Sequence, residues 1–240
     1  MNKICLLLTA SVNPQNTDGL KRNSVLDRES DYYNALVFYV KHGIPIVFCD
    51  NSMFYSEKIT ALCNLNSNCI EYISFLSKES YLGRGHGEKE IFDYAHKNSE
   101  IIKNSEFVVK LTGRLIVENI DKIIQNLIKK DFMVSANISR NLSYSDSRFF
   151  VYKKEFYLDY FEPMLKKFLS DERRFYFEFC LARGIHNLMA HQNGFILLPF
   201  YPKYIGRNGT TDKKYKKAFI KEIKYKIYQR IKIYFFNHPI

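Results

Sequence analysis

One predicted strand ends in two cations and a turn. Lys110 interrupts the apolar run Phe107–Leu111, which otherwise has the pattern of a buried strand. A buried ammonium group is costly unless it pairs with an anion or another polar group. Thr112 and Gly113 predict a turn, and Arg114 returns a second cation to the same strand end. We interpret this segment as part of an anion-binding site. The alternative is a Lys at a sheet edge that pairs with a surface acid.

A glycine-rich loop lies earlier in the chain. Gly83, Gly85 and Gly87 occupy alternate positions before a predicted helix, with Arg84 and His86 between them. Glycine lets backbone N–H groups approach a ligand closely, and a helix N-terminus attracts anions. Arg84 and His86 would add positive charge against a diphosphate. The spacing matches neither the Walker pattern nor the dinucleotide fingerprint. The alternative is a surface loop whose glycines serve only turns.

Polar residues also follow the first two predicted strands. Thr9 and Asn13 come at the end of the first strand, and Asp50 and Asn51 come directly after the second. In open α/β sheets, ligands bind beyond the carboxyl ends of the strands. Because four strand ends carry polar groups, we expect these residues to share one site with the glycine-rich loop and Lys110.

Hydrophobic periodicity predicts the elements that would position these groups. Continuous apolar runs predict buried strands at 4–9, 44–49, 70–75, 107–111 and 132–136, and helical spacing predicts helices at 30–42, 56–65, 88–103 and 116–129. This alternation predicts an α/β fold with a mostly parallel central sheet and helices on both faces. The second half is less regular, with an edge strand predicted at 149–152, helices at 153–169 and 175–190, and a short strand at 195–198.

Longer stretches resemble a known family. The segment KLTGR (110–114), preceded by GRGHGEKEIFDYAHKNS (83–99) and ICLLLTASVNP (4–14), is similar to bacterial glycosyltransferases for capsule, O-antigen and lipooligosaccharide. Members of this group resemble a GT-A-type fold. Three further segments agree in order: DSRFFVYKKEFY (146–157), DERRFYFE (171–178) and PKYIGRNGTT (202–211).

The resemblance implies an enzyme of the hexosyltransferase type (EC 2.4) on a GT-A-like Rossmann-type domain. Such an enzyme moves a sugar from a nucleotide-sugar donor, with a UDP-sugar favoured here, to a growing surface glycan or a lipid-linked acceptor. The polar strand ends and the glycine-rich loop would then bind the donor: Thr9, Asn13, Asp50, Asn51, Arg84, His86, Lys110, Thr112, Gly113 and Arg114.

The sequence departs from many GT-A enzymes at the metal site. Those enzymes hold Mn²⁺ or Mg²⁺ with an Asp-x-Asp motif that also binds the donor diphosphate, and no such motif occurs in this sequence. Asp146 and Arg148 stand at a plausible position, where Arg148 would neutralise the diphosphate in place of a metal. We therefore expect a metal-independent reaction, although a metal site built from Asp146 and a distant carboxylate stays open. No His/Cys cluster has zinc spacing.

An inverting transferase needs a general base for the acceptor hydroxyl. Glu178 is the first candidate, because its apolar neighbours in the run Phe175–Phe179 would raise its pKa. A buried structural carboxylate paired with an Arg is the alternative interpretation of Glu178. Asp171 is the second candidate for the base, although it also has the position of a helix N-cap.

The basic charge is concentrated in the last part of the chain. The 240 residues carry a net charge of +11, and the segment 213–236 holds eight Lys and Arg230 against Glu222 alone. Its apolar residues fall at helical spacing, so we expect a basic amphipathic helix on an anionic membrane surface. The alternative is a helix docked on the body of the protein. We predict a catalytic domain at 1–212, a membrane-associating tail at 213–240, and a peripheral location on the cytoplasmic face of the cell membrane.

Two other classes of protein fit parts of the sequence. A nucleic-acid-binding protein would use the basic tail, but none of the common nucleic-acid-binding motifs is present, so no nucleic acid is expected as a partner. A non-catalytic scaffold of a polysaccharide assembly complex would leave the polar strand ends without a role. The five Cys show no C-x-x-C pair and are expected to be small buried hydrophobic residues.

Overall fold

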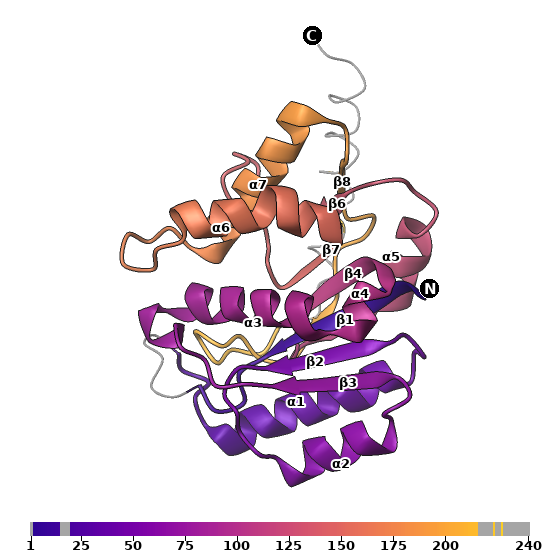
Figure 1. The fold of residues 1–240 in the computed structure, drawn as a ribbon, viewed down its shortest axis with the longest axis vertical. Helices are drawn as coiled ribbons and strands as arrows, with labels where there is room; N and C mark the ends of the chain where they lie inside the picture. Colours follow the sequence, from indigo (N-terminus) through magenta and orange to yellow (C-terminus); the bar gives the residue numbers. More distant parts are fainter. Residues whose placement is uncertain (1, 15–19, 216–222, 224–226, 228–240) are drawn as a thin grey trace.

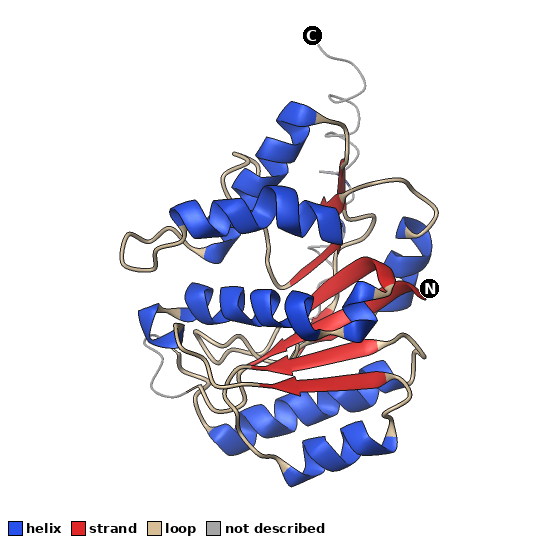
Figure 2. Cartoon of the chain, in the orientation of Figure 1, coloured by secondary structure: helices blue, strands red, loops and turns tan. Residues whose placement is uncertain are grey.

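The computed structural model describes residues 2–14 and 20–215, together with Ile223 and Ile227. Its centre is a seven-stranded sheet with the order β3-β2-β1-β4-β7-β6-β8 (Figures 1 and 2). The strands are β1 (Asn2–Ala10), β2 (Ile46–Asp50), β3 (Ile70–Ser74), β4 (Ser105–Thr112), β6 (Val134–Ala136), β7 (Phe149–Lys153) and β8 (Phe195–Leu197). A separate antiparallel pair joins β5 (Ile116–Val117) to β9 (Tyr204–Ile205).

The sheet is mostly parallel, which confirms the predicted fold class. β1 pairs in parallel with β2 and β4, β2 with β3, and β6 with β8, whereas β7 is antiparallel to both of its neighbours. This arrangement is consistent with the GT-A-like fold that the resemblance implies. Ala10 lies opposite Asp50, and Thr9 lies opposite Thr112. The register therefore brings the polar ends of β1, β2 and β4 to one edge of the sheet.

Two hydrophobic clusters cover the two faces of the sheet. Side chains alternate along β1, so that Leu6 and Leu8 face one cluster while Cys5 and Leu7 face the other. Figure 1 shows α1 and α2 on one side of the sheet and α3 on the other. The first cluster includes α1 (Val25–Val40), α2 (Glu57–Leu65) and α5 (Ile120–Leu127). The second includes α3 (Arg84–Asn98), α4 (Glu100–Lys103), the π-helical segment η2 (Phe156–Phe161), α6 (Glu162–Phe168) and α7 (Phe177–His191).

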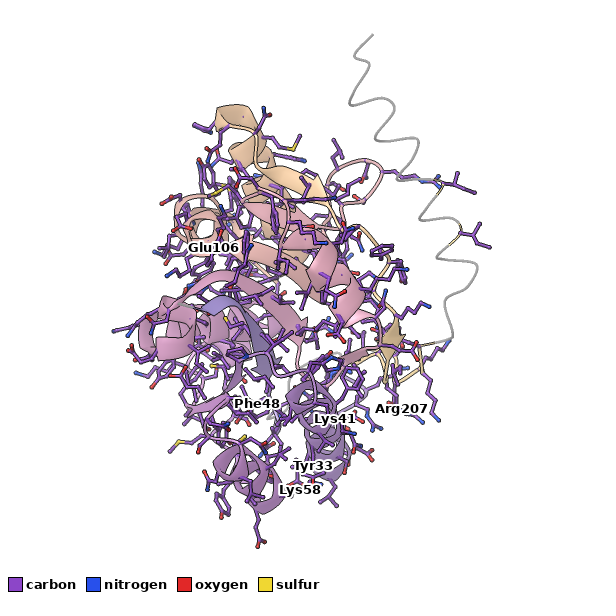
Figure 3. The ribbon with its side chains drawn as sticks, turned by 90° about the vertical axis from the view of Figure 1, so that its right-hand side faces the viewer. Tyr33, Lys41, Phe48, Lys58, Glu106 and Arg207 are labelled. Carbon is purple, nitrogen blue, oxygen red and sulfur yellow. The ribbon has the colours of Figure 1, made fainter. Side chains whose placement is uncertain are left out.

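Local capping explains where the first helices begin. Ser24 accepts a hydrogen bond from the Asp27 backbone N–H, so α1 begins earlier than the predicted start at residue 30. Ser56 caps α2 in the same way through the Ile59 N–H. The two helices also meet through their side chains: the Lys58 ammonium lies 5.8 Å from the centre of the Tyr33 ring (Figure 3).

Two sequence predictions about local structure were wrong. The segment 116–129 is not one helix, because Ile116 and Val117 pair with β9 before α5 begins at Ile120. β7 is not an edge strand, because it lies between β4 and β6. The residues Phe149–Tyr152 are all buried, and a continuous apolar run is typical of a strand that is covered on both faces.

Most of the basic tail lies outside the described residues. The predicted division into a catalytic domain and a tail therefore stays a prediction. The five Cys are free thiols, and four of them are buried. Among the helices that the structure describes, none has both the length and the hydropathy to cross a bilayer.

A histidine lies inside the aromatic part of the second cluster. His96 is partly buried, its ring stacks on Tyr157 at 4.2 Å between centres, and its Nε2 lies 2.9 Å from the Tyr152 hydroxyl. The Tyr157 hydroxyl donates to the Asp93 carboxylate. Burial among these rings lowers the pKa of His96 from its ordinary value of 6.5 to about 3. His96 is therefore neutral in the folded protein at neutral and mildly acidic pH.

We expect His96 to make folding less favourable as the pH falls below 6.5. The unfolded chain binds a proton at this residue near pH 6.5, whereas the folded chain binds it only near pH 3. The unfolded state therefore holds more protons in this window, and stability must fall with pH. Between about pH 7.5 and about pH 5.5, His96 should lower the free energy of unfolding by about 1.4 kcal/mol.

Denaturant unfolding at the two pH values checks this expectation. In His96→Phe the free energy of unfolding should no longer show this decrease between the two pH values. The exposed control His191→Phe should still show it. Equal pH dependence in His96→Phe and the unsubstituted protein would contradict the proposed burial of a neutral imidazole.

Candidate functional site

A cavity of about 470 Å³ opens beyond the carboxyl ends of β1 and β4. This volume is in the range of small-molecule sites. Thr9, Ala10 and Thr112 line it from the strand ends. The first turn of α3, the segment 144–148, the start of α7 and the loop at 208–215 form the other walls. The cavity therefore lies where ligands bind in open α/β sheets.

One end of the cavity contains Arg28, which sequence analysis did not single out. Arg28 lies in the first turn of α1, is 4% exposed, and lines the cavity. Its guanidinium donates to the Ser11 carbonyl oxygen at 2.9 and 2.5 Å, to the Arg22 carbonyl oxygen at 3.0 Å, and to the Tyr32 hydroxyl at 3.1 Å. All of these acceptors are neutral, so the positive charge of Arg28 has hydrogen-bond partners but no counter-charge among them.

Arg114 lies at the same end and has fewer partners. Within the described residues its only hydrogen bond goes to the carbonyl oxygen of Arg207, a residue labelled in Figure 3. Burial lowers the pKa of Arg114 and the neighbouring Arg28 lowers it further, whereas Tyr32, Tyr215 and Asp31 act in the opposite direction. Neither guanidinium has a carboxylate oxygen of the described residues within 4.0 Å. Arg28 is buried and Arg114 is half-buried, and neither cation has a carboxylate partner within the described residues, so a bound anion would offset their repulsion.

The other end of the cavity contains two carboxylates, Glu88 and Glu178. Glu88 lies in the second turn of α3, and Glu178 lies in the first turn of α7. The Ser147 hydroxyl donates to Glu178 Oε1 at 2.9 Å. The Lys110 ammonium pairs with Glu88 and donates to the Ser147 carbonyl oxygen. Lys110 and Ser147 therefore connect the two carboxylates.

Burial raises the pKa of Glu178, and the charge of Glu88 raises it further. The hydrogen bond from Ser147 and the charge of Lys110 act in the opposite direction. A carboxylate with raised proton affinity beside a cavity is suited to act as a general base. The structure thus places the first candidate from the sequence on the cavity wall.

Lys110 is fully buried, as the sequence suggested, and its ammonium charge is balanced by Glu88. It is 0% exposed and does not line the cavity. Glu88 supplies the anion that a buried ammonium requires. A negatively charged ligand is therefore not needed to explain Lys110, in contrast to Arg28 and Arg114.

The glycine-rich loop and Asp171 interact with each other. Asp171 Oδ2 accepts the Gly85 backbone N–H at 3.2 Å, at the N-terminus of α3. Gly83 has a φ of 134°, and a Cβ there would overlap the Asp171 carboxylate. The anion at this helix N-terminus thus comes from the protein itself. Arg84 reaches the Thr210 hydroxyl at 2.6 Å and lines the cavity, whereas His86 lies 3.8 Å from Glu79 and does not line it.

The Asp50 carboxylate holds the loop after β1 through hydrogen bonds. Its buried carboxylate accepts hydrogen bonds from the Val12 N–H at 2.8 Å and from the Ser52 hydroxyl. Burial raises the pKa of Asp50. Asn13 donates its N–H to Ser52 at 3.0 Å. Neither Asp50 nor Asn13 lines the cavity, but Asn51 does, and its amide donates to the Gly87 carbonyl oxygen at 3.1 Å.

Arg148 and Asp146 form a pair on another wall. The Arg148 guanidinium donates to both Asp146 oxygens at 2.8 and 2.5 Å and lies 4.5 Å from the centre of the Tyr204 ring. Of the two, Arg148 lines the cavity. Gly113 allows close approach of the strands, because a Cβ there would meet the Thr9 carbonyl oxygen at 2.9 Å. Within the described ranges, no group of three or more His, Cys, Asp or Glu is placed to hold a metal ion.

Several cavity residues were not predicted from the sequence, although some left a signal. The buried position of Lys110 predicted an anionic partner but did not identify Glu88. Arg28 could not be identified from the sequence, because its place on the cavity wall depends on hydrogen bonds to the carbonyl oxygen of Ser11, which lies outside its own helix. Further cavity residues that were not predicted include Tyr32, Tyr144, Ser147, Tyr176 and Tyr215.

Comparison with known proteins gives similarity of fold at low identity. No protein-family model matches the chain, and no curated protein matches it. The chain is similar to a provisionally assigned nucleotide-diphospho-sugar transferase from Desulfovibrio desulfuricans G20, with 11% identity, a TM-score of 0.44, and 82% of this chain and 80% of that chain covered. It is also similar to S. aureus TarS 1-349, with 12% identity, a TM-score of 0.48, and 84% of this chain covered. The match to a longer TarS chain has 12% identity, a TM-score of 0.46 and 84% of this chain covered.

The chain spans 59% and 36% of the two TarS chains, which is less than two thirds of their length. Similarity at this level does not carry an argument about function.

We expect inorganic pyrophosphate to stabilise the protein by binding between the Arg28 and Arg114 guanidinium groups. A ligand that binds only the folded state adds about 2.7 kcal/mol of stability at a concentration one hundred times its Kd. Arg114→Gln should lose most of the rise in Tm, and Lys41→Gln, which changes a surface cation away from the cavity, should keep it. Thermal unfolding over a pyrophosphate titration measures the effect. An unchanged titration in Arg114→Gln would contradict the assignment.

Proposed function

We propose that the protein is a glycosyltransferase that uses a nucleoside-diphosphate sugar as donor. The observation that carries this proposal is the division of one cavity into two ends. Arg28 and Arg114 define a cationic end, where no carboxylate oxygen of the described residues lies within 4.0 Å of either guanidinium, and Glu88 and Glu178 define an acidic end. A sugar nucleotide has the complementary arrangement, because its diphosphate is attached directly to the carbon that reacts.

The cationic end would hold the diphosphate. Guanidinium groups bind phosphate oxygens with charge-assisted hydrogen bonds, and Arg114 has donors that no described residue accepts. The charge of the diphosphate increases as it leaves the sugar, so fixed cations stabilise the transition state more than the bound donor. Arg148 would contribute less, because Asp146 already neutralises it.

Glu178 would act as the general base. In a direct displacement, the acceptor oxygen forms a bond to the anomeric carbon while the bond from that carbon to the diphosphate breaks. The acceptor proton passes to Glu178, and the electron pair of the broken bond leaves with the nucleoside diphosphate. The raised pKa of Glu178 favours this proton transfer.

The guanidinium groups also support the proposal that the reaction is independent of a metal ion. Arg28 and Arg114 already provide positive charge where a divalent cation would otherwise balance the diphosphate. The polar strand ends near them, Thr9 and Asn51, provide hydrogen-bonding groups for the rest of the donor. A UDP-sugar donor and a role in surface-glycan synthesis are part of the same proposal, which the sequence resemblance supports.

The basic tail supports a location on the cytoplasmic face of a membrane. Ile223 and Ile227, which belong to its apolar stripe, are 43% and 54% exposed, as a lipid-facing stripe requires. Co-sedimentation with anionic vesicles, with and without residues 213–240, tests this part of the proposal. Equal sedimentation of both forms would exclude the tail as the membrane anchor.

We expect Glu178→Gln to lower turnover by about 10²–10⁴-fold, because the amide keeps the shape but cannot accept the acceptor proton. Release of nucleoside diphosphate from a panel of sugar nucleotides, with and without EDTA, measures turnover. In the unsubstituted protein, activity should decrease as the pH is lowered, because the base must be ionised to act. The midpoint of this decrease should lie above 4.5, the ordinary pKa of Glu.

Pyrophosphate binding provides the control for this substitution, since Glu178 lies at the opposite end of the cavity. Glu178→Gln should retain it. Near-normal turnover in Glu178→Gln, with binding intact, would remove Glu178 from the role and leave Asp171 as the remaining candidate from the sequence.

A further inference from the structure

Two half-exposed tyrosines form the rim of the acidic end. Tyr144 is 40% exposed and Tyr176 is 37% exposed, and both line the same cavity as Glu178. Tyr176 is the residue before the first turn of α7, two positions before Glu178. The residue after Tyr144 is tied to the same helix, because the Ser145 N–H donates to the Glu178 carbonyl oxygen at 3.1 Å. The two rings therefore line the same cavity as the proposed base, and Tyr144 is close enough to Glu178 to interact with its charge.

Other aromatic residues hold these rings in place. Phe179 packs edge-on against Tyr144 at 5.8 Å between ring centres and stacks with Tyr176 at 6.2 Å. Phe175 contacts Phe179 at 5.5 Å. Large rigid rings with few rotatable bonds give contact area at a low cost in conformational entropy. The rim therefore offers a preorganised aromatic surface that is open to a ligand.

The charges at this end are unfavourable to an anion. Lys110 is balanced by Glu88, and Arg148 is balanced by Asp146. Arg84 donates to the Thr210 hydroxyl. The neighbouring Gly209 lies against Arg114, because a Cβ on Gly209 would meet Arg114 Nη2 at 2.8 Å. We therefore assign the Arg84 cation to the cationic end of the cavity. Glu178 remains as a half-buried acid without an ion pair among the described residues, and Glu88 adds to the negative potential that it experiences. A second anion placed here would be repelled.

We propose that Tyr144 and Tyr176 form the acceptor subsite, and that the acceptor residue bound there is an uncharged saccharide, not a uronic acid or a phosphorylated sugar. The inference rests on the proposed function and extends it to the class of acceptor. A pyranose ring has a face of C–H groups that packs on an aromatic ring, and hydroxyl groups at its edge that donate to carboxylates. Both kinds of partner are present at this end of the cavity.

Binding of matched sugar pairs tests the proposal without requiring turnover. Each pair is a methyl hexoside and the methyl hexuronide of the same configuration, in the gluco, galacto and manno series. Saturation-transfer NMR titrations give the affinity of each compound for the full chain. In every pair that binds, the neutral hexoside should bind about tenfold more tightly or better, because the acid places a carboxylate beside Glu178. Glu178→Gln should reduce this preference.

Substitutions at the rim identify the subsite. Tyr144→Ala and Tyr176→Ala should each weaken hexoside binding, whereas Tyr176→Phe should preserve it. Tyr55→Ala is the matched control, because Tyr55 is 74% exposed but does not line the cavity. Retained pyrophosphate binding shows that the Ala variants are folded and separates this inference from the donor site. Tighter or equal binding of the hexuronides, unchanged hexoside affinity in both Ala variants, or no binding in any pair would overturn it.

Discussion

Repulsion between the buried guanidinium group of Arg28 and the half-buried guanidinium group of Arg114 is the constraint on which the proposed donor site depends. Arg28 and Arg114 line one cavity end, the proximity of Arg28 contributes to the lowered pKa of Arg114, and no described carboxylate lies within ion-pair distance of either. Folding normally avoids such an arrangement, since an isolated buried charge is expensive. The fold tolerates it because the Ser11 and Arg22 carbonyl oxygens and Tyr32 solvate Arg28. Strain of this kind at a cavity is typical of a site that is completed by a ligand.

The parallel sheet makes this arrangement possible. β1, β2 and β4 end at one edge, and the backbone there is held by the protein's own polar groups, with Asp50 supporting the loop after β1 and Asp171 satisfying the N-terminus of α3. These acids hold the walls through hydrogen bonds, and neither of them lies within ion-pair distance of Arg28 or Arg114. Lys110 shows the contrast clearly, because Glu88 balances its charge inside the protein. The same cavity then separates positive charge at one end from Glu178 and the tyrosine rim at the other.

Much of the fold could be predicted from the sequence, because hydrophobic periodicity is a local property. The runs at residues 4–9 and 44–49 gave buried strands, and their polar ends indicated the edge of the sheet where the cavity lies. Long-range pairing could not be predicted in the same way. The interior position of β7 depends on β4 and β6 together. Asp171 meets Gly85 across 86 positions of sequence, and Lys110 meets Glu88 between different elements. The sequence indicated that a buried Lys needs an anion, but only the packing of α3 against the sheet identifies which one.

The most direct test of the central claim is a crystal structure of the protein with bound pyrophosphate, the group shared by all nucleoside-diphosphate sugars. The account predicts phosphate oxygens within hydrogen-bond distance of the Arg114 guanidinium, at the end of the cavity that Arg28 lines, with Lys110 still paired to Glu88. Pyrophosphate bound at another surface, with Arg28 and Arg114 unoccupied, would contradict it.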